Sequence, residues 1–358
     1  MSTVLFTGYP GFLGSALLPL VLEKRPGTNA LCVVQERFMP LAQKRLAEQT
    51  EEHPDLDGRV ELVTGDITEP GLGMDRVTDD ITKVFHLAAV YDLAVPSELA
   101  YRVNVEGTRH VLDLCWSLPG LKRLQYVSTC YVSGSHHGLF LEDQLDTGQT
   151  FQNHYEHTKF EAEQLVRNAI ADGLPATIYR PGIVVGDSVT GETQKFDGPY
   201  FLLQFLMKQP KYAVVPRVAD PDQVRFGLVP RDFVIGAIDQ LSTMDVAVGK
   251  CYALADPKAP TVRELVETFC SLLDKEPVWM RVPLKFTQVL IGLPGVERLV
   301  GFPEESVAYF AHPTVYDTTN TVTDLEGTGV SCPHFADYAP IMIEYVKMHP
   351  DVSSVAMV

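Results

Sequence analysis

Tyr155 and Lys159 are the two residues whose types and spacing most directly suggest chemistry. They are four positions apart in a segment with helical apolar periodicity, so both side chains can point toward one reacting group. A free phenol has a pKa of about 10 and exchanges protons slowly at neutral pH. We expect the ammonium of Lys159 to favour the phenolate and lower the pKa of Tyr155, which would make Tyr155 a general acid–base group.

A pair of hydroxyl side chains follows an expected strand at residues 124–129, which ends in Ser128 and Thr129. Open α/β sheets place their chemistry at the carboxyl ends of the strands. A hydroxyl at that edge can donate a hydrogen bond to a carbonyl oxygen and stabilise the alkoxide that develops there. We expect Thr129 to have this role, with Ser128 as its competitor.

A glycine-rich turn near the N-terminus is the element most typical of a cofactor site. A buried strand at 4–7 leads into Gly8, Gly11 and Gly14, and an apolar helical run at 15–22 follows. In the order strand, Gly-x-x-Gly-x-x-Gly, helix, the glycines permit a sharp turn, approach to a pyrophosphate, and close packing of helix on strand. The helix N-terminus offers free N–H groups and a positive dipole end to phosphates. The turn therefore predicts dinucleotide binding, with further contacts from Pro10, Phe12 and Leu13.

The end of the next expected strand, 30–35, is where the ribose of such a cofactor would be read. An acidic residue there binds the 2′-hydroxyl of NAD, whereas a nearby arginine binds the 2′-phosphate of NADP. Here the strand ends in Gln35, and Glu36 and Arg37 follow. We interpret Arg37 as favouring NADPH, whereas Glu36 would favour NADH.

Two later strand ends and the start of one helix complete the predicted cofactor site. Strands alternating with helices at this spacing predict an α/β fold, a Rossmann-type doubly wound parallel sheet. We expect Asn104 to start the helix after the fourth strand. A positive nicotinamide in the oxidised state would add to the effect of Lys159 on Tyr155. The further expected contacts, at the ends of strands 60–67 and 84–89, are Asp66, Ile67, Leu87, Ala88 and Ala89.

The three motifs together resemble the extended short-chain dehydrogenase/reductases. Within them, the chain most resembles the thioester reductase and fatty acyl-CoA reductase branch, with its male-sterility-type NAD(P)-binding domain, at residues 11–14, 127–132 and 179–191. The resemblance implies that Thr129 is the hydroxyl of the catalytic triad, and that an acyl thioester is reduced with NADPH to an aldehyde or an alcohol. It also implies backbone contacts to the nicotinamide carboxamide from Pro181 and Ile183. One departure is Gln35, where the branch commonly has arginine.

The regular alternation breaks after Gly186, which predicts a smaller, mainly helical substrate domain formed by C-terminal segments. We divide the chain into a Rossmann domain (1–186), a substrate-domain segment (187–227), a return to the Rossmann domain (228–258), and the substrate domain with the C-terminal region (259–358). The apolar helix pattern at 196–207 fits a wall for an acyl chain and a core helix equally well. The apolar stretch 282–300 fits packing against the small domain better than a membrane-surface or substrate-entry element.

The composition of the chain limits the classes of partner that we expect it to bind. A formal charge of −17 argues against nucleic acid, because phosphate binding needs clustered basic residues. The six cysteines are scattered, and the spacing of His154 and His157 is not that of a zinc protease, so we expect no metal. No leader pattern and no apolar stretch of 18 residues is found, so we expect a cytoplasmic protein without a transmembrane segment. The expected partner is a small-molecule substrate, such as an acyl group on CoA or a carrier protein, and a homodimer is a candidate assembly.

Three other functions stay open. A different carbonyl or alcohol oxidoreductase, acting on a steroid-like or β-hydroxy substrate, would need the same motifs. A nucleotide-sugar epimerase or dehydratase would need basic groups for the diphosphate, which Arg217, Arg225 and Arg231 could supply, but the apolar segment 196–207 argues against it. A non-catalytic dinucleotide sensor would have no use for a proton donor.

Overall fold

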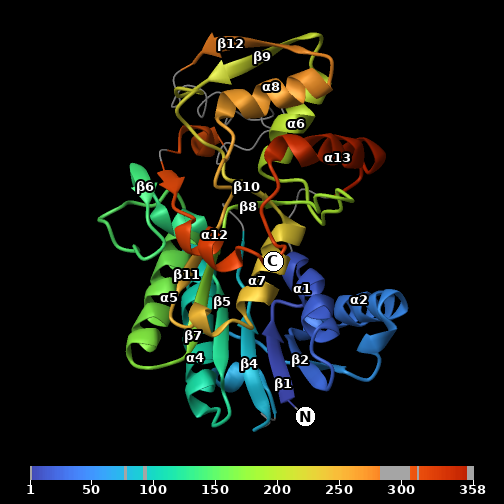
Figure 1. Ribbon diagram of the computed structural model, residues 1–358, viewed down its shortest axis with the longest axis vertical. Coiled ribbons are helices and arrows are strands. Elements are labelled where there is room, and N and C mark those ends of the chain that lie inside the picture. Colours follow the sequence, from blue (N-terminus) through green and yellow to red (C-terminus); the bar gives the residue numbers. More distant parts are fainter. Residues whose placement is uncertain (1, 76–78, 92–94, 283–306, 313, 353–358) are drawn as a thin grey trace.

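A seven-stranded parallel sheet forms the centre of the molecule in the computed structural model, which describes residues 2–75, 79–91, 95–282, 307–312 and 314–352 (Figure 1). Its strand order is β11-β7-β5-β4-β1-β2-β3, and every neighbouring pair is parallel. This confirms the predicted doubly wound α/β fold. The strands are β1 (Ser2–Thr7), β2 (Thr28–Val34), β3 (Val60–Thr64), β4 (Ile81–His86), β5 (Arg123–Val127), β7 (Ala176–Pro181) and β11 (Cys251–Leu254).

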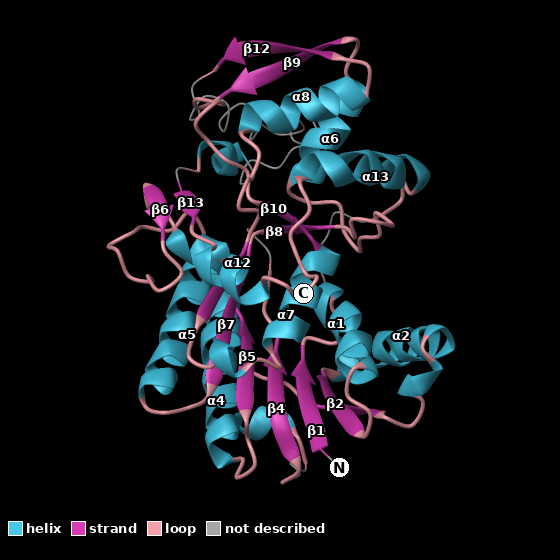
Figure 2. Ribbon diagram, in the orientation of Figure 1, coloured by secondary structure: helices cyan, strands magenta, loops and turns pink. Residues whose placement is uncertain are grey.

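Helices cover both faces of the sheet (Figure 2). On one face, α1 (Phe12–Glu23), α2 (Met39–Glu52) and α7 (Arg231–Leu241) share an apolar core with the strands. On the other face, α4 (Gly107–Ser117) and α5 (His154–Ala171) do the same. The central strands are apolar on both sides because parallel sheets are buried on both faces. The carboxyl ends of the strands therefore meet at one edge, where the predicted site residues lie.

A smaller lobe lies beyond this edge (Figures 1 and 2). The chain leaves the seven-stranded sheet after β7, and β8 (Ile183–Val185) pairs with β10 (Leu228–Pro230) in a separate two-stranded sheet before α7 and β11 return to the central sheet. The lobe is mainly helical, as predicted, with an added two-stranded sheet, and its core includes Phe269 and Tyr338. The four-segment domain division stays a prediction. The elements of the lobe are α6 (Pro199–Lys208), β9 (Tyr212–Arg217), α8 (Val262–Leu272), β12 (Glu276–Arg281) and α13 (Phe335–Met348).

Shorter elements connect these parts. Among them, β6 (Gly138–Phe140) pairs with β13 (Thr314–Tyr316) across a long stretch of sequence. The other short elements are η1 (Glu36–Phe38), η2 (Pro54–Leu56), η3 (Pro70–Gly73), α3 (Ser97–Ala100), η4 (Tyr101–Glu106), η5 (Cys130–Ser133), η6 (Asp245–Ala247), η7 (Ala308–Ala311) and α12 (Thr319–Leu325).

None of the helices in the described part of the chain has the length and apolar character needed to span a bilayer.

Some expected boundaries were wrong. The strands expected at 60–67, 84–89 and 124–129 end earlier, at Thr64, His86 and Val127, because the polar and small residues that follow them lie in loops. Asn104 does not start a helix. It lies in the π-helical turn η4, inside a helical run that begins at Ser97. The stretch expected to pack against the small domain, apart from Val282, falls outside the described residues.

Candidate active site

The glycine turn closes tightly at the end of β1. Gly8 has φ +91°, a conformation that L side chains rarely adopt, and a Cβ on it would lie 2.7 Å from the backbone nitrogen of Ala88. A Cβ on Gly11 or Gly14 would lie 2.7 Å or 2.5 Å from the Gly8 carbonyl oxygen. Helix α1 begins directly afterwards at Phe12, and no side chain caps it. The turn therefore offers the close backbone approach and the open helix N-terminus that fit a dinucleotide pyrophosphate.

The loop after β4 lies against this turn. The backbone nitrogen of Leu87 donates to the Thr7 carbonyl oxygen at 3.2 Å, and that of Ala88 donates to the Thr7 hydroxyl at 3.3 Å. Leu87, Ala88 and Ala89 are all partly exposed. The turn and the loop thus form one edge, which is where ribose and nicotinamide were expected.

A polar chain joins the ends of β2 and β3. The Gln35 amide donates to Asp66 at 2.8 Å, and its carbonyl oxygen accepts from Nε of Arg37 at 2.9 Å. Arg37 is exposed, and its guanidinium lies 4.6 Å from the centre of the Phe38 ring. Ile67 is buried against Gly107. The uncharged Gln35 therefore holds an arginine at the edge where the adenosine ribose was expected.

The two candidate hydroxyls have different partners. The Thr129 hydroxyl is close enough to the phenol of Tyr155, near the start of α5, to lower its pKa, and it accepts from the backbone nitrogen of Tyr131 at 3.3 Å. The Ser128 hydroxyl instead donates to the buried Glu163 carboxylate at 2.7 Å. This arrangement favours Thr129 as the hydroxyl that acts with Tyr155, because Ser128 is engaged in a buried network.

The sequence predicted that Lys159 lowers the pKa of Tyr155, and this prediction is wrong for the protein without its cofactor. Burial raises the pKa of Tyr155, and the Thr129 hydroxyl opposes this only in part. The Lys159 ammonium donates to the Val127 carbonyl oxygen at 2.8 Å and to the Tyr126 hydroxyl at 3.1 Å. Burial lowers the pKa of Lys159 to about 7, although the Glu163 carboxylate opposes that shift. Tyr155 is therefore protonated at neutral pH, the form that a proton donor in a reduction needs.

Contacts that the sequence did not reveal hold the start of α5. The Asn153 side chain caps the helix by accepting from the Glu156 backbone nitrogen at 2.9 Å. The buried Glu156 carboxylate accepts from the Tyr309 hydroxyl, in η7, at 2.8 Å. The Tyr91 ring packs edge-on against the Tyr155 ring, with 5.1 Å between their centres. The contacts with Tyr309 and Tyr91 tie the catalytic helix to distant segments, and a single sequence carries no signal for such pairs. The Asn153 cap is local, and an asparagine three residues before a glutamate could have indicated it.

Asn104 is engaged with protein groups. Its side chain accepts from the backbone nitrogen of Val90 at 2.9 Å, and donates to the Val90 carbonyl oxygen at 3.3 Å and to the Thr158 hydroxyl at 3.0 Å. It thus fastens the loop after β4 to α5, and its predicted contact with the cofactor stays a prediction.

Pro181 and Ile183 flank the step from β7 to β8. A Cβ on Gly198, just before α6, would lie 3.2 Å from Cγ2 of Ile183. The start of α6 therefore lies beside the residue expected to contact nicotinamide.

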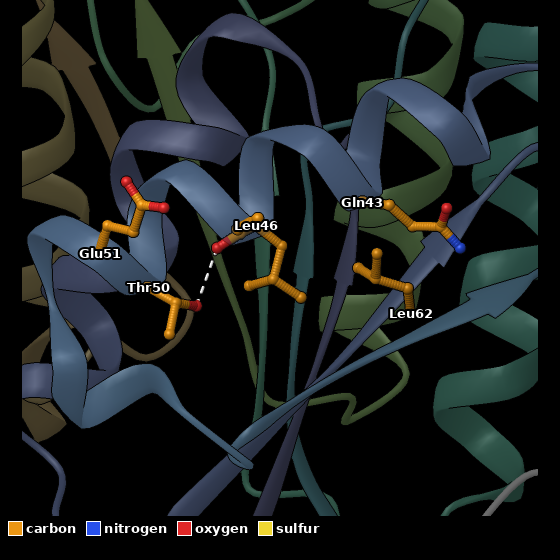
Figure 3. Close-up of a pocket in the computed structure, with 6 residues that line it drawn as sticks. Gln43, Leu46, Thr50, Glu51 and Leu62 are labelled. Carbon is orange, nitrogen blue, oxygen red and sulfur yellow. Dashed lines mark hydrogen bonds between the residues drawn. The ribbon is translucent and has the colours of Figure 1, made fainter.

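A hollow elsewhere on the sheet is unrelated to these residues. It lies between α2 and the edge strand β3 (Figure 3). None of the predicted catalytic or cofactor residues lines it, so we assign no chemistry to it. The hollow is lined by Gln43, Leu46, Ala47, Thr50, Glu51 and Leu62.

In the part of the chain that the structure describes, no group of three or more His, Cys, Asp or Glu side chains could hold a metal ion.

Comparison with known proteins agrees with this site. Residues 6–238 match the male sterility protein family of NAD-binding domains. A nonribosomal peptide synthetase of Aspergillus flavus is 25% identical over 91% of this chain and 34% of its own length. A putative fatty acyl-CoA reductase of Drosophila melanogaster is 27% identical over 51% of this chain and 41% of its own length. The chain thus spans less than half the length of either relative.

A solved structure covers nearly the whole chain. The terminal R domain from the myxalamid PKS-NRPS biosynthetic pathway is 26% identical, with a TM-score of 0.82. The alignment covers 99% of this chain and 92% of that domain. The similarity therefore includes the smaller lobe as well as the sheet.

Proposed function

The chain belongs to the male sterility protein family, whose members are NAD(P)-dependent reductases of the extended short-chain dehydrogenase/reductase type, and on this premise we propose that it reduces an acyl thioester or an aldehyde with NADPH. The observation that carries the proposal is the position of the Tyr155 phenol beside the Thr129 hydroxyl, close enough for that hydroxyl to lower its pKa, at the carboxyl edge of the sheet. This pair lies at the same edge as the glycine turn, with Lys159 one helical turn further along α5.

The side chains would divide the reaction as follows. When bound, the reduced nicotinamide supplies a hydride to the carbonyl carbon. Thr129 donates a hydrogen bond to the carbonyl oxygen, and Tyr155 gives its proton to that oxygen as negative charge develops there. With a thioester, the carbon–sulfur bond then breaks, and the products are an aldehyde and a free thiol. An aldehyde that accepts a second hydride and proton becomes an alcohol. Lys159 supplies positive charge beside the phenol.

The substrate would lie toward the smaller lobe. The apolar core of that lobe is flanked by partly buried side chains: Tyr131 from η5, Ile183 from β8, and Phe201 and Phe205 from α6. Phe196 and Tyr200, in contrast, are fully buried core residues. We infer that an acyl chain on CoA or on a carrier protein extends along the partly buried aromatics of α6.

Chain length should therefore affect specificity. Each buried methylene contributes about 0.8 kcal/mol, so two more carbons should raise kcat/KM several-fold until the apolar site is full. Replacing Phe201 or Phe205 by alanine should flatten this dependence if that ring touches the acyl chain. The measurement is kcat/KM with NADPH across acyl-CoAs and aldehydes of increasing length. Leu203→Ala, in the core of the lobe, is the control, which should lower stability without changing the slope.

The cofactor preference should depend on Arg37. We expect Arg37→Ala to weaken NADPH binding about tenfold and to leave NADH binding nearly unchanged, because only NADPH carries the 2′-phosphate. Titrating both cofactors against the wild type and the variant measures this. Glu36→Ala is the matched variant and should not weaken NADPH. Equal binding of both cofactors by the wild type would refute the preference and make Glu36 the ribose reader.

One screen tests the proposed function as a whole. Cofactor oxidation is followed with acyl-CoAs, aldehydes, ketones and nucleotide sugars. We expect turnover with a thioester or an aldehyde. Activity on a ketone or a nucleotide sugar alone would refute the proposed substrate, but the assignment as a reductase would stand.

A further inference from the structure

Tyr126 is a buried residue that the proposed chemistry does not use, yet it contacts Lys159 in two ways. Its hydroxyl accepts a hydrogen bond from the Lys159 ammonium at 3.1 Å, and the same ammonium lies 4.6 Å from the centre of its ring. Both side chains are almost fully buried. The Val127 carbonyl oxygen, at 2.8 Å, is the second acceptor for the ammonium. Two groups at the end of β5 thus fix the end of an otherwise flexible side chain.

The ring of His86 lies beside Tyr126, with 5.6 Å between the two ring centres. Nε2 of His86 contacts the Thr108 hydroxyl at 3.1 Å. That hydroxyl donates its only proton to the Asn104 carbonyl oxygen at 2.6 Å, so it must accept from Nε2 of His86. An ammonium can only donate, so the Tyr126 hydroxyl directs a lone pair at Lys159.

The same reasoning fixes the tautomer of His86. Because Nε2 carries the proton, Nδ1 accepts from the Thr7 hydroxyl at 2.8 Å, and that hydroxyl accepts from the Ala88 backbone nitrogen at 3.3 Å. Burial lowers the pKa of His86 to about 3, and the charge of Lys159 adds to this, so the ring stays neutral. A continuous chain of hydrogen bonds therefore runs from Thr108 through His86 to the loop that faces the glycine turn.

We propose that Tyr126 is a positioning residue, which holds the Lys159 ammonium at the carboxyl edge of the sheet and itself lies beside the ring of His86. This proposal depends on the proposed function in one respect, which is that Lys159 takes part in the reaction. Two of the ammonium's three protons are used by β5, so the third is left to face the reacting groups. The titratable groups that face Lys159 are Tyr126 from β5, His86 from β4, and Tyr155 and Glu163 from its own helix.

Tyr126→Phe tests the proposal, because it removes the acceptor and keeps the ring. The ammonium then loses a hydrogen bond that favours its charged form, so its titration midpoint should fall by about one pH unit. The direct measurement is the ¹³Cε NMR titration of Lys159 in the protein without cofactor, with the signal assigned by its loss in Lys159→Met. The alkaline limb of kcat/KM should shift in the same direction.

Tyr179→Phe is the matched control. Tyr179 is also fully buried, and its hydroxyl donates to Gln125 at 2.7 Å, away from Lys159. The variant should lose similar stability and keep the wild-type midpoint. Equal midpoints in Tyr126→Phe and Tyr179→Phe would overturn the proposal. If Tyr126→Phe does not fold, Tyr126→Leu decides the matter, because it also removes the hydroxyl and should move the midpoint in the same direction, and an unmoved midpoint would overturn the proposal.

The two proposals fail separately. If none of the thioesters or aldehydes supports oxidation of NADPH, the proposed function is refuted, and the NMR midpoint still tests the role of Tyr126. An unmoved midpoint in an active enzyme would refute only the role of Tyr126.

Discussion

Tyr155→Phe should lower kcat about a hundredfold or more while the fold and cofactor binding are preserved. The variant lacks the proton donor, and general acid–base catalysis typically contributes this much to a rate. The fold should tolerate the change because the Thr129 hydroxyl still accepts from the Tyr131 backbone nitrogen at 3.3 Å. Steady-state kinetics with NADPH measure the loss, and cofactor titration and thermal unfolding measure what is preserved.

Tyr179→Phe is the control for this experiment too. This variant deletes one buried hydroxyl from strand β7, and its kcat should stay within a few-fold of wild type. Near-normal turnover by a well-folded Tyr155→Phe would discard the proposed mechanism. The pH profile adds a second check. Because burial raises the pKa of Tyr155, loss of its proton should not limit the rate between about pH 6 and 9.

Local sequence patterns predicted the features that depend on local geometry. The glycines were identifiable because a strand, a turn and a helix in this order need their small size, and the structure has φ +91° at Gly8. Tyr155 and Lys159 share a helix because their spacing is helical. The strand ends were misplaced by two or three residues, since small and polar residues continue the alternation without continuing the hydrogen bonds.

The rest depends on pairs that are distant in sequence. The shift in the pKa of Tyr155 was predicted in the wrong direction because burial raises that pKa, and burial cannot be read from spacing. Tyr126 contacts Lys159, but the sequence does not distinguish it from an ordinary buried aromatic residue of a strand. The pairing of β9 with β12 joins segments on either side of the return to the sheet, and neither segment indicates its partner.

The largest stability effect should come from Glu163, which the sequence presents as one helical glutamate among several. Its carboxylate is fully buried and accepts two bonds from Arg180, at 2.7 Å and 3.0 Å, one from Arg167 at 2.8 Å and one from Ser128 at 2.7 Å. Burial by itself raises the pKa of Glu163, but Arg180, followed by Arg167 and Ser128, outweighs burial and holds that pKa at about 2. The cluster fastens the catalytic helix α5 to strand β7.

Glu163→Gln should therefore lower the free energy of unfolding at pH 7 by about 3–5 kcal/mol, because it leaves the buried Arg180 charge without its partner. The effect should depend on pH. A carboxylate with a folded pKa of about 2 and an ordinary unfolded pKa contributes stability above about pH 4.5, and that contribution is lost as the pH falls toward 2. The difference between wild type and variant should thus be constant from pH 7 to about pH 5 and shrink below it.

Urea unfolding of both proteins across this pH range measures the difference, and Glu161→Gln is the control. Glu161 lies on the same helix and is partly exposed, and its one ion pair among the described residues is with His157 at 3.9 Å, so its loss should change stability by less than about 0.5 kcal/mol. A Glu163→Gln protein within 1 kcal/mol of wild type at pH 7 would contradict the prediction. It would mean that Arg180 finds other acceptors when α5 shifts, for example the Gln144 carbonyl oxygen that it already contacts at 2.6 Å.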